Sequence, residues 1–172
     1  LNCVVMRGVN DGQVLDMIDH FRGSGHVLRF IEYMDVGTCN EWNRDRVVPS
    51  VELRKQIDAR WPIRPMPANY GGEVAQRWTF VDGSGEIGFI SSVSEPFCGD
   101  CTRARLSADG RLYTCLFADN GYDLLGPLRA GASDAELSQL IAAIWTARDD
   151  RYSEIRGSVD TRSRERVEMY EI

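Results

Sequence analysis

The segment from Pro96 to Phe117 constrains the fold of this chain more than any other part of the sequence. It contains a C-x-x-C pair, Cys98 and Cys101, and thirteen residues then separate Cys101 from Cys115. Apolar and polar residues alternate on both sides of the Ala-Asp-Gly sequence at 108–110, which predicts a β-hairpin. A chain folded back at that turn would return Cys115 towards the pair. The spacing therefore predicts that three sulfurs converge on one point.

Three converging thiols would form a metal centre with one coordination position left open. A closed structural zinc site takes four protein ligands, and this segment offers no fourth. The two histidines, His20 and His26, lie far upstream and are interpreted as structural. Thiolates without carboxylate or imidazole partners favour an iron–sulfur cluster or zinc over magnesium or calcium. Two alternatives stay open: a zinc knuckle completed by a ligand elsewhere, and a set of buried thiols.

The cysteines of this chain are interpreted as ligands rather than as disulfide partners. Their number, five, is odd, Cys3 and Cys39 stand alone, and the first residues lack a secretory signal. We therefore expect a reducing, cytoplasmic location. The net charge of −6 argues against a general nucleic-acid surface. No apolar run reaches the roughly 18 residues that a membrane span requires.

Two arginines, Arg103 and Arg105, directly follow the cysteine pair, and the period of two in a strand puts both side chains on one face. On their own they would be interpreted as a solvated strand face. Beside an open metal position they predict an anionic substrate, because each guanidinium presents a planar fork of donors to phosphate oxygens. Thr102 and Ala104 are predicted to point the other way, towards the packing of the domain.

The N-terminal part of the chain predicts a strand–helix–strand unit with parallel strands. Residues 2–6 form a short β-branched apolar run, and residues 27–34 form a second one. Between them, apolar residues at helical spacing lead from a helix start at 10–12 to Phe21. Ligands of parallel α/β folds usually bind at the carboxyl ends of the strands.

Two charged residues, Arg29 and Glu32, lie in the otherwise apolar strand at 27–34. Without other information, a buried ion pair between them is as good an interpretation as a functional role. Met34, at the end of this strand, would by itself be assigned to the core.

The remainder of the chain predicts helices and antiparallel hairpins. Ser50 caps a helix through about Trp61, and prolines then break the regularity. Residues 75–81 and 86–92 predict a hairpin. A capping box at 133–136 predicts the start of a helix with one apolar stripe.

The cysteine segment resembles the C-terminal cluster motif of the GTP 3′,8-cyclase family, the radical S-adenosylmethionine enzymes that open molybdenum cofactor biosynthesis. The matching residues are Cys98-Gly-Asp-Cys101-Thr-Arg103-Ala-Arg105-Leu, then Asp109-Gly110, then Cys115-Leu-Phe. Upstream, Val5-Met-Arg-Gly-Val-Asn-Asp11 and Arg29-Phe-Ile-Glu-Tyr-Met34 resemble the late barrel strands of that family. The resemblance thus covers most of the chain.

The resemblance implies roles for particular residues. A [4Fe–4S] cluster whose fourth iron has no protein ligand would be held by Cys98, Cys101 and Cys115. The guanine base of GTP would coordinate that iron, and the GTP-contacting segment of the family corresponds to Arg103, Ala104 and Arg105. Met34 matches a position that contacts S-adenosylmethionine, and Arg29 lies near the same active-site mouth.

The resemblance also implies chemistry that this chain would not perform alone. In the family, a second [4Fe–4S] cluster on an N-terminal C-x-x-x-C-x-x-C motif cleaves S-adenosylmethionine to a 5′-deoxyadenosyl radical. This radical abstracts a hydrogen from the ribose of GTP, and the carbon radical attacks C8 of the purine. The motif is absent here, and the chain ends at Ile172 rather than in the usual pair of glycines. We therefore expect the C-terminal part of a lyase, inactive in isolation and without a catalytic residue of its own.

The expected fold is α/β in two domains. Residues 1–48 would form the last βα units of an incomplete TIM-type barrel. Residues 49–172 would form a C-terminal α+β iron–sulfur domain with antiparallel hairpins that binds GTP. The strand at 2–6 would have lost a neighbour, and an exposed strand edge invites pairing with another chain. We therefore expect a homodimer or other self-association.

Two other functions stay open. A zinc-stabilised interaction module would explain the cysteines without any substrate. An auxiliary-cluster domain of another radical enzyme, acting on peptides, would also explain them. Such domains usually bring more cysteines than the three clustered here, which disfavours that interpretation.

Overall fold

The computed structural model describes residues 1–36 and 42–156, which form two compact units. The first unit comprises Leu1–Met34 and Trp42–Cys101, and the second comprises the described residues of Asp35–Glu41 and Thr102–Ile172. In the described part of the chain, no helix combines the length and the apolar character needed to cross a membrane.

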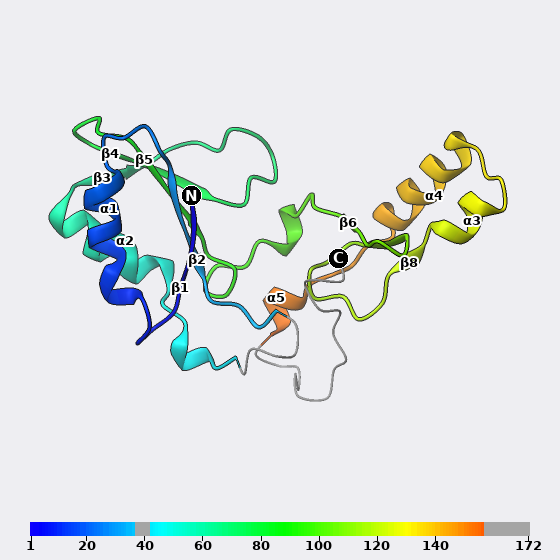
Figure 1. Cartoon of the computed structure of the whole chain (residues 1–172), viewed down its shortest axis with the longest axis horizontal. Coiled ribbons are helices and arrows are strands. Elements are labelled where there is room, and N and C mark those ends of the chain that lie inside the picture. The colour runs from blue at the N-terminus through cyan, green and yellow to red at the C-terminus, as the bar shows by residue number, and fades with distance from the viewer. Residues whose placement is uncertain (37–41, 157–172) are drawn as a thin grey trace. The chain divides into compact units, whose positions relative to one another are not determined.

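A five-stranded mixed sheet forms the centre of the first unit (Figure 1), with the strand order β1-β2-β5-β4-β3. The pairs β1–β2 and β2–β5 are parallel, whereas β5–β4 and β4–β3 are antiparallel. The strands are β1 (Asn2–Val5), β2 (Leu28–Glu32), β3 (Ile63–Pro65), β4 (Gln76–Phe80) and β5 (Glu86–Ile90). The predicted pair of parallel strands and the predicted hairpin are confirmed.

Two helices, α1 (Val14–Phe21) and α2 (Ser50–Arg60), pack on one face of this sheet (Figure 1). Short 3-10 turns lie in the segments before them, η1 (Asp11–Gln13) and η2 (Arg44–Arg46). Successive side chains of a strand point to opposite faces, so only alternate strand positions join the core. The buried core residues are Val5, Val14, Ile18, Leu28, Phe30, Val48, Leu53, Ile57, Ile63, Phe80, Ile87 and Phe89.

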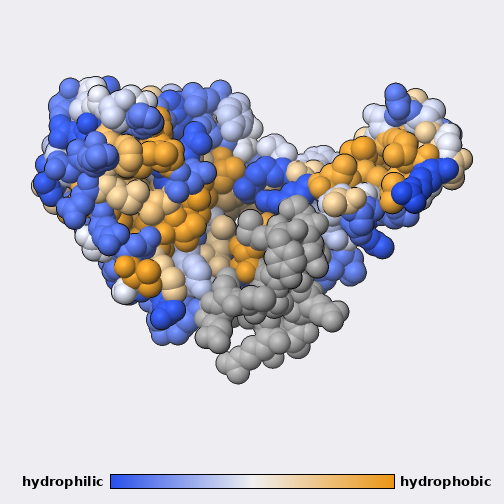
Figure 2. All heavy atoms as spheres, viewed as in Figure 1, coloured by the Kyte–Doolittle hydropathy of each residue, from blue (hydrophilic) through white to orange (hydrophobic). Residues whose placement is uncertain are grey.

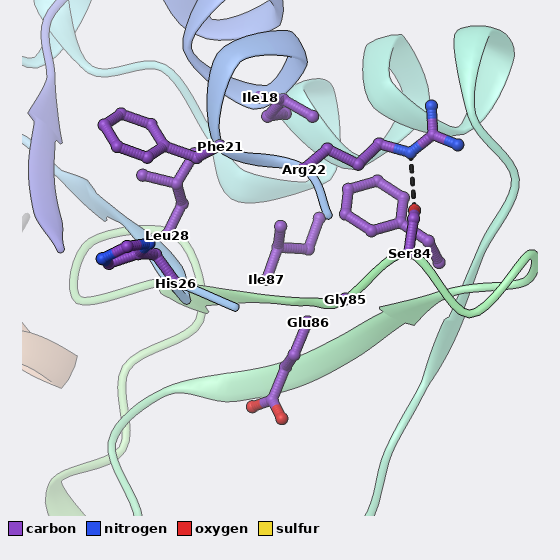
Figure 3. A pocket seen from close by; sticks show the side chains of 10 residues that line it. Ile18, Phe21, Arg22, His26, Leu28, Ser84, Gly85, Glu86 and Ile87 are labelled. Carbon is purple, nitrogen blue, oxygen red and sulfur yellow. Dashed lines mark hydrogen bonds between the residues drawn. The ribbon is translucent and has the colours of Figure 1, made fainter. Parts of the chain in front are cut away.

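A small pocket lies where the end of α1 meets the turn between β4 and β5 (Figure 3). Arg22 Nε donates to Ser84 Oγ at 2.6 Å across it. The Arg22 guanidinium also lies over the rings of Trp61 and Phe80, 5.4 Å from each centroid. The pocket volume is about 10 Å³, which is room for about one water molecule. It is a gap in the packing rather than a ligand site.

The second unit contains a three-stranded antiparallel sheet in the order β6-β7-β8. Its elements are β6 (Arg105–Leu106), β7 (Arg111–Tyr113), β8 (Tyr122–Asp123), α3 (Leu125–Arg129), α4 (Asp134–Thr146) and α5 (Tyr152–Ile155). The predicted cysteine-segment hairpin is confirmed as β6–β7. Its turn includes Gly110, whose φ of 79° is a conformation that residues with a side chain rarely adopt.

Helix α4 begins at the predicted capping box. Ser133 Oγ accepts from the N–H of Glu136 at 3.3 Å, and the Glu136 carboxylate accepts from the N–H of Ser133 at 2.8 Å. Of the predicted apolar stripe, Ile144 is buried, Leu137, Leu140 and Trp145 are half-buried and Ile141 is exposed, so the stripe is only partly covered. Figure 2 shows apolar residues on the surface of α3 and α4, where Leu128 and Ile141 are 52% and 40% exposed.

The expected mixed α/β fold with antiparallel hairpins is confirmed, whereas the incomplete TIM-type barrel stays a proposal. The sheet of the first unit combines strands from both sides of residue 48, and the domain ranges 1–48 and 49–172 stay a prediction. Strand β1 is at an edge of the sheet, and Val4 on it is 48% exposed. The predicted self-association through this edge is likewise still a prediction.

Candidate metal centre

Cys98 and Cys101 lie on one short turn at the end of the first unit. The 3-10 turn η3 (Cys98–Asp100) is capped by Cys101, whose N–H donates to the carbonyl oxygen of Cys98 at 3.4 Å. Both side chains are half-buried and neither is in a disulfide. Residues three apart lie above one another in such a turn, so the C-x-x-C spacing suits two thiols that share a ligand.

Cys115 follows β7 in the second unit and is also half-buried. Its sulfur accepts a hydrogen bond from the backbone N–H of Phe117 at 3.4 Å. Phe117 is 7% exposed and stacks on Tyr152, with ring centroids 4.5 Å apart. Hydrogen bonds to cysteine sulfurs are among the contacts that set the potential of iron–sulfur clusters. The surroundings of Cys115 therefore suit a thiolate ligand.

The three cysteines fit an iron–sulfur cluster by the chemistry of their donors, because all three are half-buried and none is in a disulfide. The pair belongs to the first unit and Cys115 to the second, so the convergence of the three sulfurs stays a prediction. Within residues 1–36 and 42–156, no group of three or more His, Cys, Asp or Glu side chains is placed so that it could hold a metal ion. Ligation by these cysteines is therefore a proposal.

Cys3, on β1, is also half-buried and in no disulfide, but it lies far from these three in the sequence. Burial raises the pKa of the Cys3 thiol, which disfavours the thiolate form that metals bind. Asn10 Nδ2 donates to its sulfur at 3.9 Å. Cys39 lies outside the described residues.

Arg103 and Arg105 are half-buried, and β6 begins at Arg105. Thr102 and Ala104 are exposed. Exposure thus alternates as predicted, but the prediction that Thr102 and Ala104 face the packing was wrong. The strand is short and at an edge, and long arginine side chains bury their stems along such a surface. Contact of the arginines and Ala104 with GTP stays a proposal.

Arg29 and Glu32 are separated by the pleat of β2. Being three residues apart, they project to opposite faces, and Arg29 is exposed whereas Glu32 is only 2% exposed. The interpretation of a buried ion pair between them was therefore wrong. On the face opposite the core, Gly88 is the cross-strand neighbour of Arg29, and a Cβ there would lie 3.2 Å from Arg29 Cγ. Met34, just beyond β2, is half-buried.

Asp35 belongs to a buried cluster in the second unit that the sequence analysis missed. Arg156 Nε donates to Asp35 Oδ1 at 2.7 Å, and the Tyr152 hydroxyl donates to Asp35 Oδ2. The Arg156 guanidinium lies over the rings of Phe117 and Tyr152, 5.0 and 5.4 Å from their centroids. The four side chains are between 3% and 7% exposed. This cluster holds Phe117, whose N–H donates to Cys115.

Comparison with known proteins identifies the family of the chain. Residues 26–154 match the family Molybdenum Cofactor Synthesis C. The match extends over the parallel strand β2, the cysteine pair and the β6–β7 hairpin, and the chain belongs to this family.

Relatives called GTP 3′,8-cyclase match nearly the whole chain. The relative from Xanthomonas axonopodis pv. citri (strain 306) is 59% identical over 99% of this chain and 50% of its own length. The relative from Acidothermus cellulolyticus is 50% identical over 96% of this chain and 47% of its own length. The relative from Synechococcus sp. (strain CC9605) is 50% identical over 91% and 44%. The resemblance to the cyclase family is confirmed, and the chain spans about half the length of these relatives.

Proposed function

We propose that this chain serves as the C-terminal part of a GTP 3′,8-cyclase. That radical S-adenosylmethionine lyase converts GTP to (8S)-3′,8-cyclo-7,8-dihydroguanosine 5′-triphosphate in molybdenum cofactor biosynthesis. One observation carries the proposal: half-buried cysteines in C-x-x-C…C spacing, none of them in a disulfide, lie in a chain 59% identical to a protein of that name. The proposal includes a cytoplasmic, reducing location, where cysteines stay available as ligands.

The cluster of this proposal is a [4Fe–4S] group held by Cys98, Cys101 and Cys115. When bound, it supplies an iron with an open coordination position for the guanine base. The contribution of the chain is to keep three thiolates available, since none is in a disulfide. The N–H of Phe117 donates to the sulfur of Cys115, which favours its thiolate form because hydrogen bonds to a charged form stabilise it.

The residues of the proposed substrate and cofactor sites belong to both units. Arg103 and Arg105 would bind the phosphates of GTP, with Ala104 between them in the contacting segment. Arg29 and Met34 would contribute to the S-adenosylmethionine side, together with a second [4Fe–4S] cluster of the N-terminal half. Exposure of Arg29 on the face of the sheet away from the core supports this role.

The proposal is tested by the response of the reconstituted chain to GTP. Anaerobic loading with iron and sulfide should give a protein whose thermal unfolding midpoint rises with GTP concentration, because a ligand that binds the folded state stabilises it. ATP at equal concentration is the control for non-specific binding of a triphosphate. If chelators unfold the β6–β7 hairpin and GTP has no effect on stability, the chain is instead a zinc-stabilised interaction module.

A further inference from the structure

The segment between β5 and the cysteine pair has no regular structure, yet it is fixed by one buried side chain. The N–H groups of Val93 and Ser94 donate to Glu32 Oε2 at 2.8 and 2.7 Å. The hydroxyl of Ser94 donates to Glu32 Oε1. Two consecutive backbone amides are thus held four and five residues before Cys98. All of these residues belong to the first unit.

Glu32 is itself held in one position from its other side. Its Oε1 accepts from the N–H and the hydroxyl of Ser50, at 2.8 and 3.1 Å, at the first residue of α2. Free N–H groups at the start of a helix favour a carboxylate. Glu32 is 2% exposed, and no arginine or lysine of the described residues forms an ion pair with it. Its carboxylate therefore joins α2 to the 93–94 turn.

A second attachment follows one residue later. Glu95 accepts from Arg54 Nη2 at 2.8 Å and from Gln76 Nε2 at 2.6 Å. Its own N–H donates to the carbonyl oxygen of Ser91 at 3.0 Å. Only Pro96 and Phe97 then separate this attachment from Cys98. The cysteine pair therefore follows a short segment that is hydrogen-bonded to α2 and β4.

We propose that Glu32 is a positioning residue for Cys98 and Cys101. By fixing the amides of Val93 and Ser94, it sets the direction in which the chain enters the η3 turn. A metal site needs its ligands held by such outer contacts, and their loss typically weakens metal binding by about 10- to 100-fold. This inference rests on the proposed function, since it gives the two cysteines a cluster to hold.

The test replaces Glu32 with glutamine, which has the same size but turns an NH₂ group towards N–H donors. In the metal-free chain, amide exchange at Val93 and Ser94 should accelerate about 10- to 100-fold, the range for losing a hydrogen bond to a charged group. Exchange in α1 and β2 should be unchanged. In the reconstituted protein, E32Q should lose iron to a chelator about tenfold faster than the parent, and the EPR spectrum of the reduced cluster should broaden.

Two further variants make the result specific. Ser94→Ala removes only the hydroxyl donor to Glu32 and leaves both N–H donors, so a smaller change in the same direction is expected. Glu52→Gln is the matched control, because Glu52 lies on α2 but pairs with Arg7 at 2.7 Å. In this variant, amide exchange at 93–94 and iron retention should equal those of the parent.

Three outcomes would count against the inference or its basis. Loss of protection throughout β2 and α2 in E32Q would make Glu32 a general core residue and overturn the inference. Unchanged exchange at 93–94 with unchanged iron retention would also overturn it. A parent chain that takes up no cluster, while exchange at 93–94 still responds to E32Q, would overturn the proposed function but leave Glu32 as the residue that orders this segment.

Discussion

Two buried carboxylates that lie three residues apart in the sequence have different kinds of hydrogen-bond partners. Glu32 in the first unit is surrounded by neutral donors, three backbone N–H groups and two hydroxyls. Asp35 in the second unit meets a cation, Arg156, in addition to the Tyr152 hydroxyl. Both are at most 3% exposed. Each network supports part of the proposed cluster site. Glu32 holds the segment just before the cysteine pair, and the cluster of Asp35 holds Phe117, whose N–H donates to Cys115.

The difference predicts how much stability each unit loses when a partner of its buried carboxylate is removed. Neutral donors can be removed one at a time, and each loss costs about one hydrogen bond. A buried ion pair fails as a whole, because removing one partner leaves an uncompensated charge in a medium that solvates it poorly. We therefore expect local effects around Glu32 and a larger, cooperative effect around Asp35.

The largest effect is expected from Asp35→Ala. It leaves the Arg156 guanidinium, 7% exposed, without its carboxylate, and breaking such a buried pair typically costs about 3–5 kcal/mol. Urea unfolding monitored on the second unit measures the loss. Replacing both residues, Asp35→Ala with Arg156→Met, should recover much of it. A single-variant loss below about 1 kcal/mol, typical of a surface ion pair, would contradict the account of a buried one.

The next prediction distinguishes the residues proposed to contact GTP from those that stabilise the fold around Glu32 and Asp35. Arg103→Ala or Arg105→Ala should weaken GTP binding about 10- to 100-fold, since a charge-assisted contact to phosphate contributes roughly 1.5–3 kcal/mol. Iron per chain should stay unchanged, because neither residue is a ligand. Calorimetry and iron analysis of each variant in the full-length enzyme measure the two quantities. Loss of the cluster at unchanged GTP affinity would mean that the arginines are structural.

A matched pair of hydroxyl deletions compares the two networks directly. Tyr152→Phe removes the hydroxyl donor to Asp35, and Ser50→Ala removes one donor to Glu32. Tyr152→Phe should cost about 1.5–3 kcal/mol as a lost bond to a charged group. Ser50→Ala should cost less, about 0.5–1.5 kcal/mol, because the N–H of Ser50 still donates to the same oxygen. Urea unfolding of both variants measures these losses of stability. Equal losses would mean that the two networks respond alike.

The smallest effect concerns acid stability of the first unit. The hydrogen bond from Arg54 holds the pKa of Glu95 below its ordinary value. A lowered pKa in the folded state stabilises the fold above the unfolded-state value of about 4.3, and this stabilisation is lost as pH falls through the folded-state pKa. Glu95 is 41% exposed, so Glu95→Gln should destabilise the protein by less than about 1 kcal/mol at pH 7. Unfolding curves of parent and variant should converge near pH 3; a constant difference at all pH values would exclude this origin.

Local patterns in the sequence predicted most elements of the fold. Short apolar runs predicted β1 and β2, hairpin signals predicted the β4–β5 and β6–β7 pairs, and the capping box predicted the start of α4. Strand β3 was missed, because Pro65 is its last residue and Pro62 and Pro67 flank it. It exists because it is at the edge of the sheet, where proline is tolerated.

The supports of the candidate site could not be predicted in the same way. The donors to Glu32 at positions 93 and 94 include backbone N–H groups, which every residue except proline carries, so no side-chain pattern marks them. The partners of Asp35 lie 117 and 121 residues away, beyond the reach of any local period. The ion pair considered as one interpretation of Arg29 and Glu32 does not form, because residues three apart in a strand project to opposite faces.

The iron content of chains that each lack one thiol tests the central claim most directly. After anaerobic reconstitution, the parent should hold about four irons with matching sulfide, as a [4Fe–4S] group requires. Serine at Cys98, Cys101 or Cys115 should abolish this content, whereas Cys3→Ser, the control for a thiol outside the set, should leave it intact. A single zinc per parent chain, or full iron content in Cys115→Ser, would contradict the account.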